Sequence, residues 1–300
     1  MSEPGTPSFD QLQTFLAVVE TGSFAAAARR QGRAVSAISY AIANLEAQLG
    51  LPLFDRHATR KPVLTQAGRA VLADARKVAR GVDELRAKVK GLLEGLEAEV
   101  SLVVDVMFPT TRLVDALQAF QTAFPTVTLR LHVEALGAVT QLVRDGVSGV
   151  GVSGPLPVEG EDLSQIAVGT VELIPVAAPF HPLAHGRGQA PGAARNHTQL
   201  VLTDRSKLTE GRDFAVLSLN TWRLADLGSK HALLLAGVGW GNMPSYMVQG
   251  DIEAGRLVEL SLPDYAGTLY AFQLVYRPEA PPGPAAQWLI QRFVDQVAEG

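Results

Sequence analysis

Three hydroxyl-bearing side chains near the N-terminus recur at a spacing that places them on one side of a helix. Ser36, Ser39 and Tyr40 share this side, and Arg33 lies just before the predicted helix. Hydroxyl groups donate hydrogen bonds to phosphate oxygens or base edges, and a guanidinium can approach a phosphate or a guanine. A solvated helix face is the alternative explanation for polar residues at these positions. We favour contact with DNA because of the helices that surround them.

Three cations follow in the segment 53–64, whose sequence is LFDRHATRKPVL. The segment is too polar for a helix and is interrupted by Pro62, so it suits a two-stranded wing. Arg56, Arg60 and Lys61 would then be available to bind phosphates, with surface ion pairs as the alternative.

Helix signals place these side chains in a helical head. Ser8 and Gln11 resemble a capping box, and an apolar stripe follows as far as Gly22. A second short helix would run over residues 23–32, and a third from about Val35 to Leu49. Two helices joined by a tight turn, the second with a polar outer face, predict a helix-turn-helix whose second member enters the major groove.

The segment after Thr65 has the most regular apolar pattern in the chain. Apolar residues recur at alternating steps of four and three along a helix that Thr65 would cap: Val71, Ala75, Val78, Val82, Leu85, Val89 and Leu92. A stripe this narrow suits pairing with one other helix better than it suits a broad core face. We therefore expect a linker helix over residues 66–92 that pairs with its copy in a second chain. Packing against the C-terminal part of its own chain is the alternative.

From residue 99 onward the pattern changes to strands that alternate with helices. Strands are predicted near residues 100–106, 127–133, 147–153, 171–177, 200–202, 214–217, 238–241 and 268–276. Helices are predicted near residues 111–124, 135–145, 221–236, 244–250 and 284–298. Such alternation implies an α/β fold in which parallel sheets are covered by helices on both faces. Two such sheets, of about 100 residues each, would leave a cleft between them.

Polar residues follow several of these strands, at the strand ends where doubly wound sheets bind ligands. Thr110 and Thr111 stand at a predicted helix start, where free N–H groups and hydroxyls favour an anion. The other candidates are a strand end, a turn and a second predicted helix start: Ser153, Asp204, Arg205, Ser206, Thr221 and Trp222. A helix cap is the alternative role for each of them. We expect a small, anionic organic molecule to bind in the cleft.

Three glycines match the spacing of a nucleotide-binding motif. Gly149, Gly151 and Gly154 fit the GxGxxG pattern, but Pro155 follows at once and prevents the helix that would hold a pyrophosphate. We interpret these glycines as positions of close backbone packing at the cleft.

No other motif supports catalysis or a bound cofactor. His181 and His185 lie on a predicted loop without a carboxylate or Cys to complete a metal site, and the chain has no GxSxG elbow. We therefore expect no cofactor, no metal ion and no enzymatic activity.

Composition sets broad limits on the protein. The 300 residues are 47% hydrophobic and 19% charged, so the chain can bury a sizeable core and is too long for one small module. It contains no Cys, which excludes disulfides and thiolate nucleophiles. The start MSEPGTPSFD lacks the basic and apolar parts of a signal peptide, and no apolar run is long enough to span a membrane. We expect a globular, cytoplasmic protein with no membrane partner.

Charge is divided unevenly along the chain. Residues 1–90 hold 13 Lys/Arg against 8 Asp/Glu, and residues 91–300 hold 13 against 22. The basic first part suits a polyanion, whereas the acidic second part must bind an anion through local donors.

The first part resembles the DNA-binding head of LysR-type transcriptional regulators. Positions that match the family's spacing are Phe15, Gly22, Ser23, Phe24, Ala27, Ala28, Ser39, Leu45, Glu46, Leu49, Gly50, Leu53, Phe54, Arg56, Leu64, Thr65 and Gly68. The segments VDVMFP (104–109), FPTVTLRLHVEALG (124–137) and LLLAGVGWGNMP (233–244) are similar to the effector-binding domain of the same family. Gln31 replaces a usually apolar residue, and Tyr40 replaces a frequent Arg, which bears on base preference.

This resemblance implies a winged helix-turn-helix over residues 1–65, a linker helix over 66–92 and an effector-binding domain over 93–300. The effector-binding domain would be periplasmic-binding-protein-like (type II), with lobe I at about 97–168 and 270–300 and lobe II at about 169–269. Such proteins usually act as tetramers built from two kinds of dimer contact, and they change the bending of promoter DNA when an inducer enters the cleft.

We therefore expect a sequence-specific transcriptional regulator. Its expected partners are double-stranded promoter DNA, a small inducer and further copies of itself, as a homodimer or homotetramer. One alternative is a regulator whose lobes only hold the oligomer together. The other is an enzyme or transport-type binding protein fused to a DNA-binding head.

Overall fold

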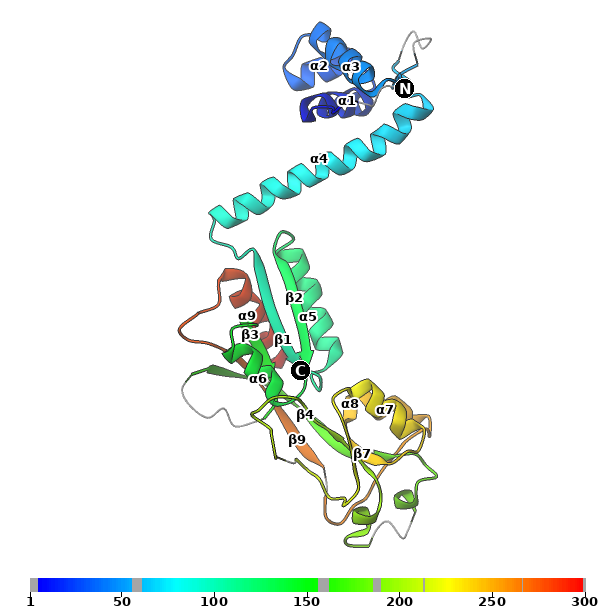
Figure 1. The fold of residues 1–300 in the computed structure, drawn as a ribbon, viewed down its shortest axis with the longest axis vertical. Coiled ribbons are helices and arrows are strands. Elements are labelled where there is room, and N and C mark those ends of the chain that lie inside the picture. The colour runs from blue at the N-terminus through cyan, green and yellow to red at the C-terminus, as the bar shows by residue number, and fades with distance from the viewer. Residues whose placement is uncertain are drawn as a thin grey trace. The chain divides into compact units, whose positions relative to one another are not determined.

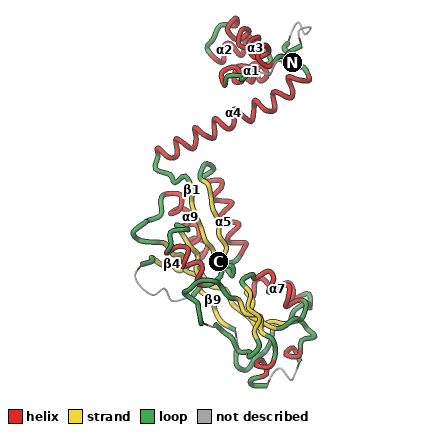
Figure 2. The backbone as a smooth tube through the Cα atoms, in the orientation of Figure 1, coloured by secondary structure: helices red, strands yellow, loops and turns green. Residues whose placement is uncertain are grey.

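The computed structural model describes residues 5–55, 61–155, 162–185, 190–212, 214–265 and 267–298 (Figure 1). The chain divides into two compact units, Met1–Lys90 and Gly91–Gly300. We call them the head unit and the C-terminal unit and describe each by itself. The described part of the head unit is mainly helical, whereas the C-terminal unit combines strands with helices (Figure 2).

Three short helices form the head: α1 (Phe9–Thr21), α2 (Phe24–Gln31) and α3 (Val35–Leu49). Their bounds confirm the predicted helices. Ser8 and Gln11 form the capping box at the start of α1, and Ser23 caps α2. Apolar side chains from all three helices share one core around the fully buried Phe15 and Leu45.

The segment after α3 turns back on itself. Phe54 and Leu64 form an antiparallel bridge, and the Asp55 N–H donates to the Val63 carbonyl oxygen over 2.7 Å. The described residues here form one bridge and not the two strands that we predicted.

The helix α4 (Gln66–Leu93) follows this segment. Thr65 caps it as predicted, because its Oγ1 accepts from the Gly68 N–H over 2.9 Å and also donates to the Pro52 carbonyl oxygen over 2.7 Å. Gly68 permits this close approach, since a Cβ at that position would overlap the Leu53 carbonyl oxygen.

The C-terminal unit is built on one mixed sheet. Its strands are β1 (Glu99–Asp105), β2 (Thr128–Glu134), β3 (Val150–Ser153), β4 (Ser164–Ala177), β5 (Gln199–Leu202), β6 (Thr221–Leu224), β7 (Trp240–Pro244), β8 (Val258–Glu259) and β9 (Thr268–Tyr276). Their order is β2-β1-β3-β9-β4-β7-β5-β6, with β8 beside β4. β1 is parallel to β2 and β3, and β5 is parallel to β6 and β7, as the alternation of strands and helices predicts.

The strands β4 and β9 join these two parallel groups. β9 pairs antiparallel with β3 and with β4, and β4 pairs antiparallel with β7. Figure 1 shows both strands running between the two groups. The prediction of two separate sheets is therefore wrong, because the ladders of β4 and β9 make them one. The β4–β9 register shifts between Ala167 and Thr170, beside Gly169 with φ +98°. We use lobe I for residues 97–168 and 270–298 and lobe II for residues 169–269.

The longer helices of this unit are α5 (Thr110–Ala123), α6 (Gly137–Arg144), α7 (Leu227–Leu235), α8 (Ser245–Glu253) and α9 (Pro284–Ala298). Short 3-10 helices, η1 (Pro182–Ala184) and η3 (Ala193–Asn196), lie in lobe II. The core contains the fully buried Phe120, Phe272 and Phe293. Glu97 caps α9 by accepting from the N–H groups of Ala285 and Ala286 over 2.9 and 3.1 Å.

Two predicted elements of lobe II are wrong. The described residues among 214–217 form no strand, and the helix predicted from residue 221 begins at Leu227. Thr221–Leu224 instead form β6, beside β5. A β-branched residue followed by Trp suits a strand, and Asp226 supplies the actual N-cap of α7 by accepting from the Ser229 N–H.

Candidate functional site

The polar face of α3 is exposed on the head unit. Ser36, Ser39 and Tyr40 are all exposed, Tyr40 with 70% of its surface, whereas Ile38 and Ile42 on the other side are buried. The buried side fixes the rotation of the helix. The three hydroxyls therefore form one outward face, as the sequence predicts.

Of the four cations predicted to contact DNA, the structure describes two, Arg33 and Lys61. Arg33 donates to both carboxylate oxygens of Asp10, over 3.0 and 2.9 Å. Lys61 is exposed beside the Phe54–Leu64 bridge. Arg56 and Arg60 lie outside the described residues. Because an exposed ion pair is weak, Arg33 can exchange Asp10 for a phosphate at small cost.

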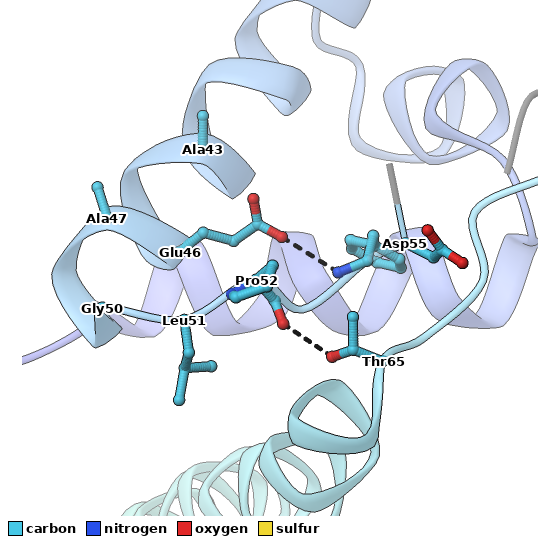
Figure 3. A pocket seen from close by; sticks show the side chains of 9 residues that line it. Ala43, Glu46, Ala47, Gly50, Leu51, Pro52, Asp55 and Thr65 are labelled. Carbon is cyan, nitrogen blue, oxygen red and sulfur yellow. Dashed lines mark hydrogen bonds between the residues drawn. The ribbon is translucent and has the colours of Figure 1, made fainter. Parts of the chain in front are cut away.

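A hollow of about 540 Å³ lies between the end of α3 and the segment that leads to α4 (Figure 3). Glu46 Oε1 accepts from the N–H groups of Leu53 and Phe54 over 2.7 and 3.1 Å, and Thr65 donates to Pro52. These bonds hold the start of the wing against α3. The polar groups that Figure 3 joins thus bind one another, which indicates a structural role.

The predicted seam of α4 divides into two parts. Val71 and Ala75 pack against the core of the head, and Ala75 is only 2% exposed. The prediction that Ala75 faces a second chain is therefore corrected, because the first turns of α4 complete the head. The remaining seam residues are exposed or partly exposed: Val78, Val82, Leu85, Val89 and Leu92.

A cavity of about 400 Å³ in the C-terminal unit is lined by residues of both lobes. Its wall is mainly apolar, with Met107 and Leu136 from lobe I and Leu173 and Phe214 from lobe II. Leu136 and Ala215 in this wall have positive φ angles of 51° and 52°. Size, apolar lining and strained backbone together are typical of a small-molecule site.

Lys230, on α7, contributes a buried amine to the cavity wall. Its surface is only 2% exposed, and its Nζ donates to the Asn242 carbonyl oxygen over 2.7 Å. Burial lowers the pKa of Lys230 to about 7. Within the described part of the chain, no carboxylate pairs with this amine.

Two other polar atoms of the wall have no hydrogen-bond partner among the described residues. They are Asn242 Oδ1 and Tyr265 Oη, and both atoms are buried. Burial also raises the pKa of Tyr265. Gln199 differs from them, because its amide donates to Ala215 and accepts from Leu217, each over 2.8 Å. Among the described wall residues, Asn242 and Tyr265 therefore each have an unused polar atom, and Lys230 has one hydrogen-bond partner.

Asp105, at the end of β1, supports the wall from behind. Its carboxylate accepts from the Met107 N–H over 2.8 Å, the Leu136 N–H over 3.2 Å and the Tyr270 hydroxyl over 2.8 Å. Burial raises the pKa of Asp105 to about 6, although these hydrogen bonds act in the opposite direction. Since all three partners line the cavity, Asp105 positions its lobe I side.

The residues predicted to bind the ligand do not line this cavity. Thr110 and Thr111 begin α5, as predicted, and are exposed. Ser153 is buried at the end of β3, where its hydroxyl lies 3.2 Å from that of Thr140 and donates to the Gly154 carbonyl oxygen.

The predicted turn lies beside the start of α6. Asp204, Arg205 and Ser206 line a second hollow, of about 330 Å³. Asp204 accepts from the Ala138 N–H over 2.8 Å and from the Ser206 hydroxyl over 2.9 Å. The Ala138 N–H at the start of α6 therefore already binds a carboxylate of the protein itself.

Thr221 and Trp222 require a correction. They were predicted to stand at a helix start, but they lie on β6, at one end of the sheet order, where Trp222 is 55% exposed. On a strand, these residues have no helix start beside them to supply free N–H groups.

The cavity residues with unused polar atoms were not selected from the sequence. Lys230 could have been noticed as a Lys that stands just before the apolar run ALLLAG (232–237). Asn242 and Tyr265 give no sequence signal, because only the packing of β7 and of the loop before β9 removes their partners.

The glycine pattern packs closely at two of its three positions, as predicted. A Cβ at Gly151 would lie 2.8 Å from Val143 Cγ2, and one at Gly154 would overlap the Tyr270 hydroxyl. A Cβ at Gly149 would make only ordinary contacts, at 3.8 Å.

The described residues offer few other groups suited to catalysis or metal binding. His181 caps η1 through Nδ1, and burial lowers its pKa to about 4. No group of three or more potential metal ligands occurs among the residues that the structure covers. None of the helices it covers is both long and apolar enough to cross a membrane.

Comparison with known families relates both units to one group of proteins. Residues 9–69 match the bacterial regulatory helix-turn-helix protein, lysR family, and residues 93–298 match the LysR substrate binding domain. The chain belongs to the LysR family of transcriptional regulators. This confirms the family and the fold class expected from the sequence, a helix-turn-helix head followed by an α/β effector-binding domain.

Curated relatives of this LysR-family protein are transcriptional regulators. The HTH-type transcriptional regulator AceR of Acinetobacter baumannii is 29% identical over 287 residues, which cover 94% of each chain. The HTH-type transcriptional activator AllS of Klebsiella pneumoniae is 30% identical over 83% of this chain and 93% of its own length.

Solved structures share the fold along nearly the whole chain. Full-length LysG from Corynebacterium glutamicum, with bound effector Arg, has a TM-score of 0.53 and 19% identity and covers 98% of this chain and 99% of its own. A full-length variant of AphB has a TM-score of 0.53 and 20% identity, and it covers 95% of this chain and 98% of its own.

Proposed function

We propose that this LysR-family protein acts in the cytoplasm, where it binds specific promoter sequences through α3 and the wing. We propose further that a small organic inducer, bound in the cavity between the lobes, changes that binding. The observation that carries the proposal is the pairing, in one chain, of an exposed hydroxyl face on a basic head with a largely apolar cavity that has unused polar atoms.

The geometry of α3 supports entry into the major groove. Its buried side is held by the head core, so Ser36, Ser39 and Tyr40 can face base edges and phosphates together. Arg33 and Lys61 would contact neighbouring phosphates, and the same role is proposed for Arg56 and Arg60.

The exposed part of the α4 seam supports self-association. Val78, Leu85 and Val89 repeat along one side of the helix and are each nearly half exposed or more. A homodimer that pairs these stripes would present two heads to a pseudo-palindromic operator. A homotetramer would need a second contact between copies.

The cavity supports a sensing role. LysG, of the same fold, is known with its effector Arg bound, so this fold accommodates an effector. The named relatives are regulators, and the described cavity wall contains no combination of Ser, His and Asp suited to nucleophilic catalysis. We therefore propose that the inducer is bound without being chemically changed.

The hydroxyls of Thr110 and Thr111 remain proposed ligand contacts, although neither lines the cavity. Replacing both by Val removes two hydroxyls at similar shape. If they bind the inducer, the inducer response should fall about tenfold or more while uninduced operator binding persists. An unchanged dose response would exclude them.

DNA retention by the full-length protein tests the first half of the proposal. Genomic fragments retained by the protein are sequenced to find the operator, and operator affinity is then measured for Ser39→Asp and for a control, Gln118→Asp. The control adds the same charge at an exposed position of the C-terminal unit. We expect only the Ser39 variant to lose specific binding. Equal affinity of the two variants would contradict the assignment of α3.

Ligand screening by thermal shift tests the second half. A ligand at about 100 times its dissociation constant adds about 2.7 kcal/mol to the free energy of unfolding. Operator binding that never responds to any stabilising ligand would favour a regulator whose lobes only assemble the oligomer.

A further inference from the structure

Among the described residues, the buried amine of Lys230 has no carboxylate partner of the kind that a buried cation needs. Its one hydrogen bond is to the Asn242 carbonyl oxygen, and no described carboxylate pairs with it. An ammonium group has three donors, and leaving a buried cation unpaired is unfavourable. The position adds to this cost, because Lys230 lies in the N-terminal half of α7, where the helix dipole disfavours positive charge.

Two further unused atoms belong to residues that line the same cavity, and they indicate what a ligand would need there. Lys230 and the Tyr265 hydroxyl are donors, whereas Asn242 Oδ1 is an acceptor. A molecule that fills the site therefore needs an anionic acceptor group and one hydrogen-bond donor. The rest of the wall, including Met107 and Leu173, requires an apolar body.

The number of cations limits the charge of the acceptor group. Lys230 is the only Lys or Arg among the described residues that line the cavity. One cation matches a singly charged carboxylate better than a doubly charged phosphate. The cavity, at about 400 Å³, has room for a molecule of modest size.

We propose that this cavity binds a small monocarboxylate with an apolar body, whose carboxylate pairs with Lys230 and whose hydrogen-bond donor reaches Asn242. Tyr265 donates to the same ligand. This inference rests on the proposed inducer function of the cavity and names the chemical class of the inducer.

The experiment compares acids with their own amides on the full-length protein. Benzoate, phenylacetate, hexanoate and mandelate are titrated by calorimetry beside benzamide, phenylacetamide, hexanamide and mandelamide. Each pair differs only in the group that would face Lys230. We expect at least one acid, with mandelate the best candidate because of its hydroxyl, to bind roughly tenfold or more tightly than its amide. Failure of every acid to bind better than its amide would overturn the proposal.

Two variants test whether Lys230 causes the preference for an acid over its amide. Lys230→Gln removes the charge and keeps an N–H donor for the Asn242 carbonyl oxygen, and Lys207→Met removes an exposed cation as the control. We expect the Gln variant, checked for folding by circular dichroism, to bind the acid no better than the amide, and the control to keep the parent's preference. An undiminished preference in a folded Gln variant would overturn the assignment of Lys230.

A parallel operator-binding assay separates this proposal from the proposed function. If acids bind through Lys230 but leave operator affinity unchanged, the carboxylate site stands and the inducer role fails. If an identified inducer acts equally on the parent and the Lys230→Gln variant, the inducer role stands and the Lys230 site fails.

Discussion

Burial of the Lys230 amine, which pairs with no carboxylate in the part of the chain that the structure describes, should make the stability of the C-terminal unit depend on pH. Burial lowers the pKa of Lys230 from 10.5 to about 7. In the unfolded chain the amine keeps its ordinary pKa, so between about pH 7 and 10.5 the unfolded state binds the additional proton. The free energy of unfolding therefore rises with pH in that window. Below about pH 7 the whole penalty is present, on the order of 5 kcal/mol at most.

Lys230→Met removes this charge at similar side-chain length. It also removes the hydrogen bond to the Asn242 carbonyl oxygen, which costs roughly 1 to 3 kcal/mol. The variant should therefore be more stable than the parent by about 2 to 4 kcal/mol just below neutral pH. Its advantage should shrink by about a factor of ten in the unfolding equilibrium constant per pH unit above pH 7.

Urea unfolding followed by tryptophan fluorescence measures this difference. The chain's three tryptophans, Trp222, Trp240 and Trp288, all lie in the C-terminal unit, so the signal reports on that unit. Lys207→Met, at an exposed position, serves as the control and should follow the parent at every pH. If the free energies of unfolding of the Lys230→Met variant and the parent change in parallel from pH 6 to 9, Lys230 is solvated or paired and the reasoning is refuted.

Three other predictions concern the head, the linker and the glycine pattern. Ser39→Asp, which sets a negative charge against DNA phosphates, should lower operator affinity at least tenfold in a gel-shift titration without changing the melting temperature of the head. Glu at both Val82 and Leu85 would bury four like charges in a paired helix, so sedimentation should show loss of the native oligomer; an unchanged mass would mean that the seam faces something else. Gly154→Ala should destabilise the C-terminal unit by about 1 to 3 kcal/mol in urea unfolding because the Tyr270 ring must move, whereas Gly149→Ala, which adds only ordinary contacts, should not.

Local signals determined what could be predicted from the sequence. The capping residues Ser8 and Ser23 and the glycines that end the first three helices each act within a few residues, so the bounds of α1, α2 and α3 follow from the sequence. The narrow stripe of α4 was equally readable, but its pattern does not distinguish a partner helix from the head core that buries Ala75.

The cavity depends on contacts between distant residues, which no local pattern contains. Met107 of lobe I and Lys230 of lobe II are far apart in sequence and line one cavity only because β4 and β9 join the lobes. Thr221 was misplaced for a related reason: its segment became a strand because β5 offers a parallel edge, a tertiary contact that overrides local helical periodicity.

The β4–β9 ladder also makes lobe II an insertion whose two ends meet. Thr170 pairs with Ala271 and Val171 pairs with Tyr270, so the chain leaves lobe I and returns to it through adjacent strand positions. A gene chimaera that exchanges this insertion between relatives has to match only those two neighbouring junctions. Lys230 would move with the transferred lobe II, whereas Asp105 would stay behind in the donor. Recombination at this ladder can therefore give an existing promoter-binding protein a new ligand preference in a single step.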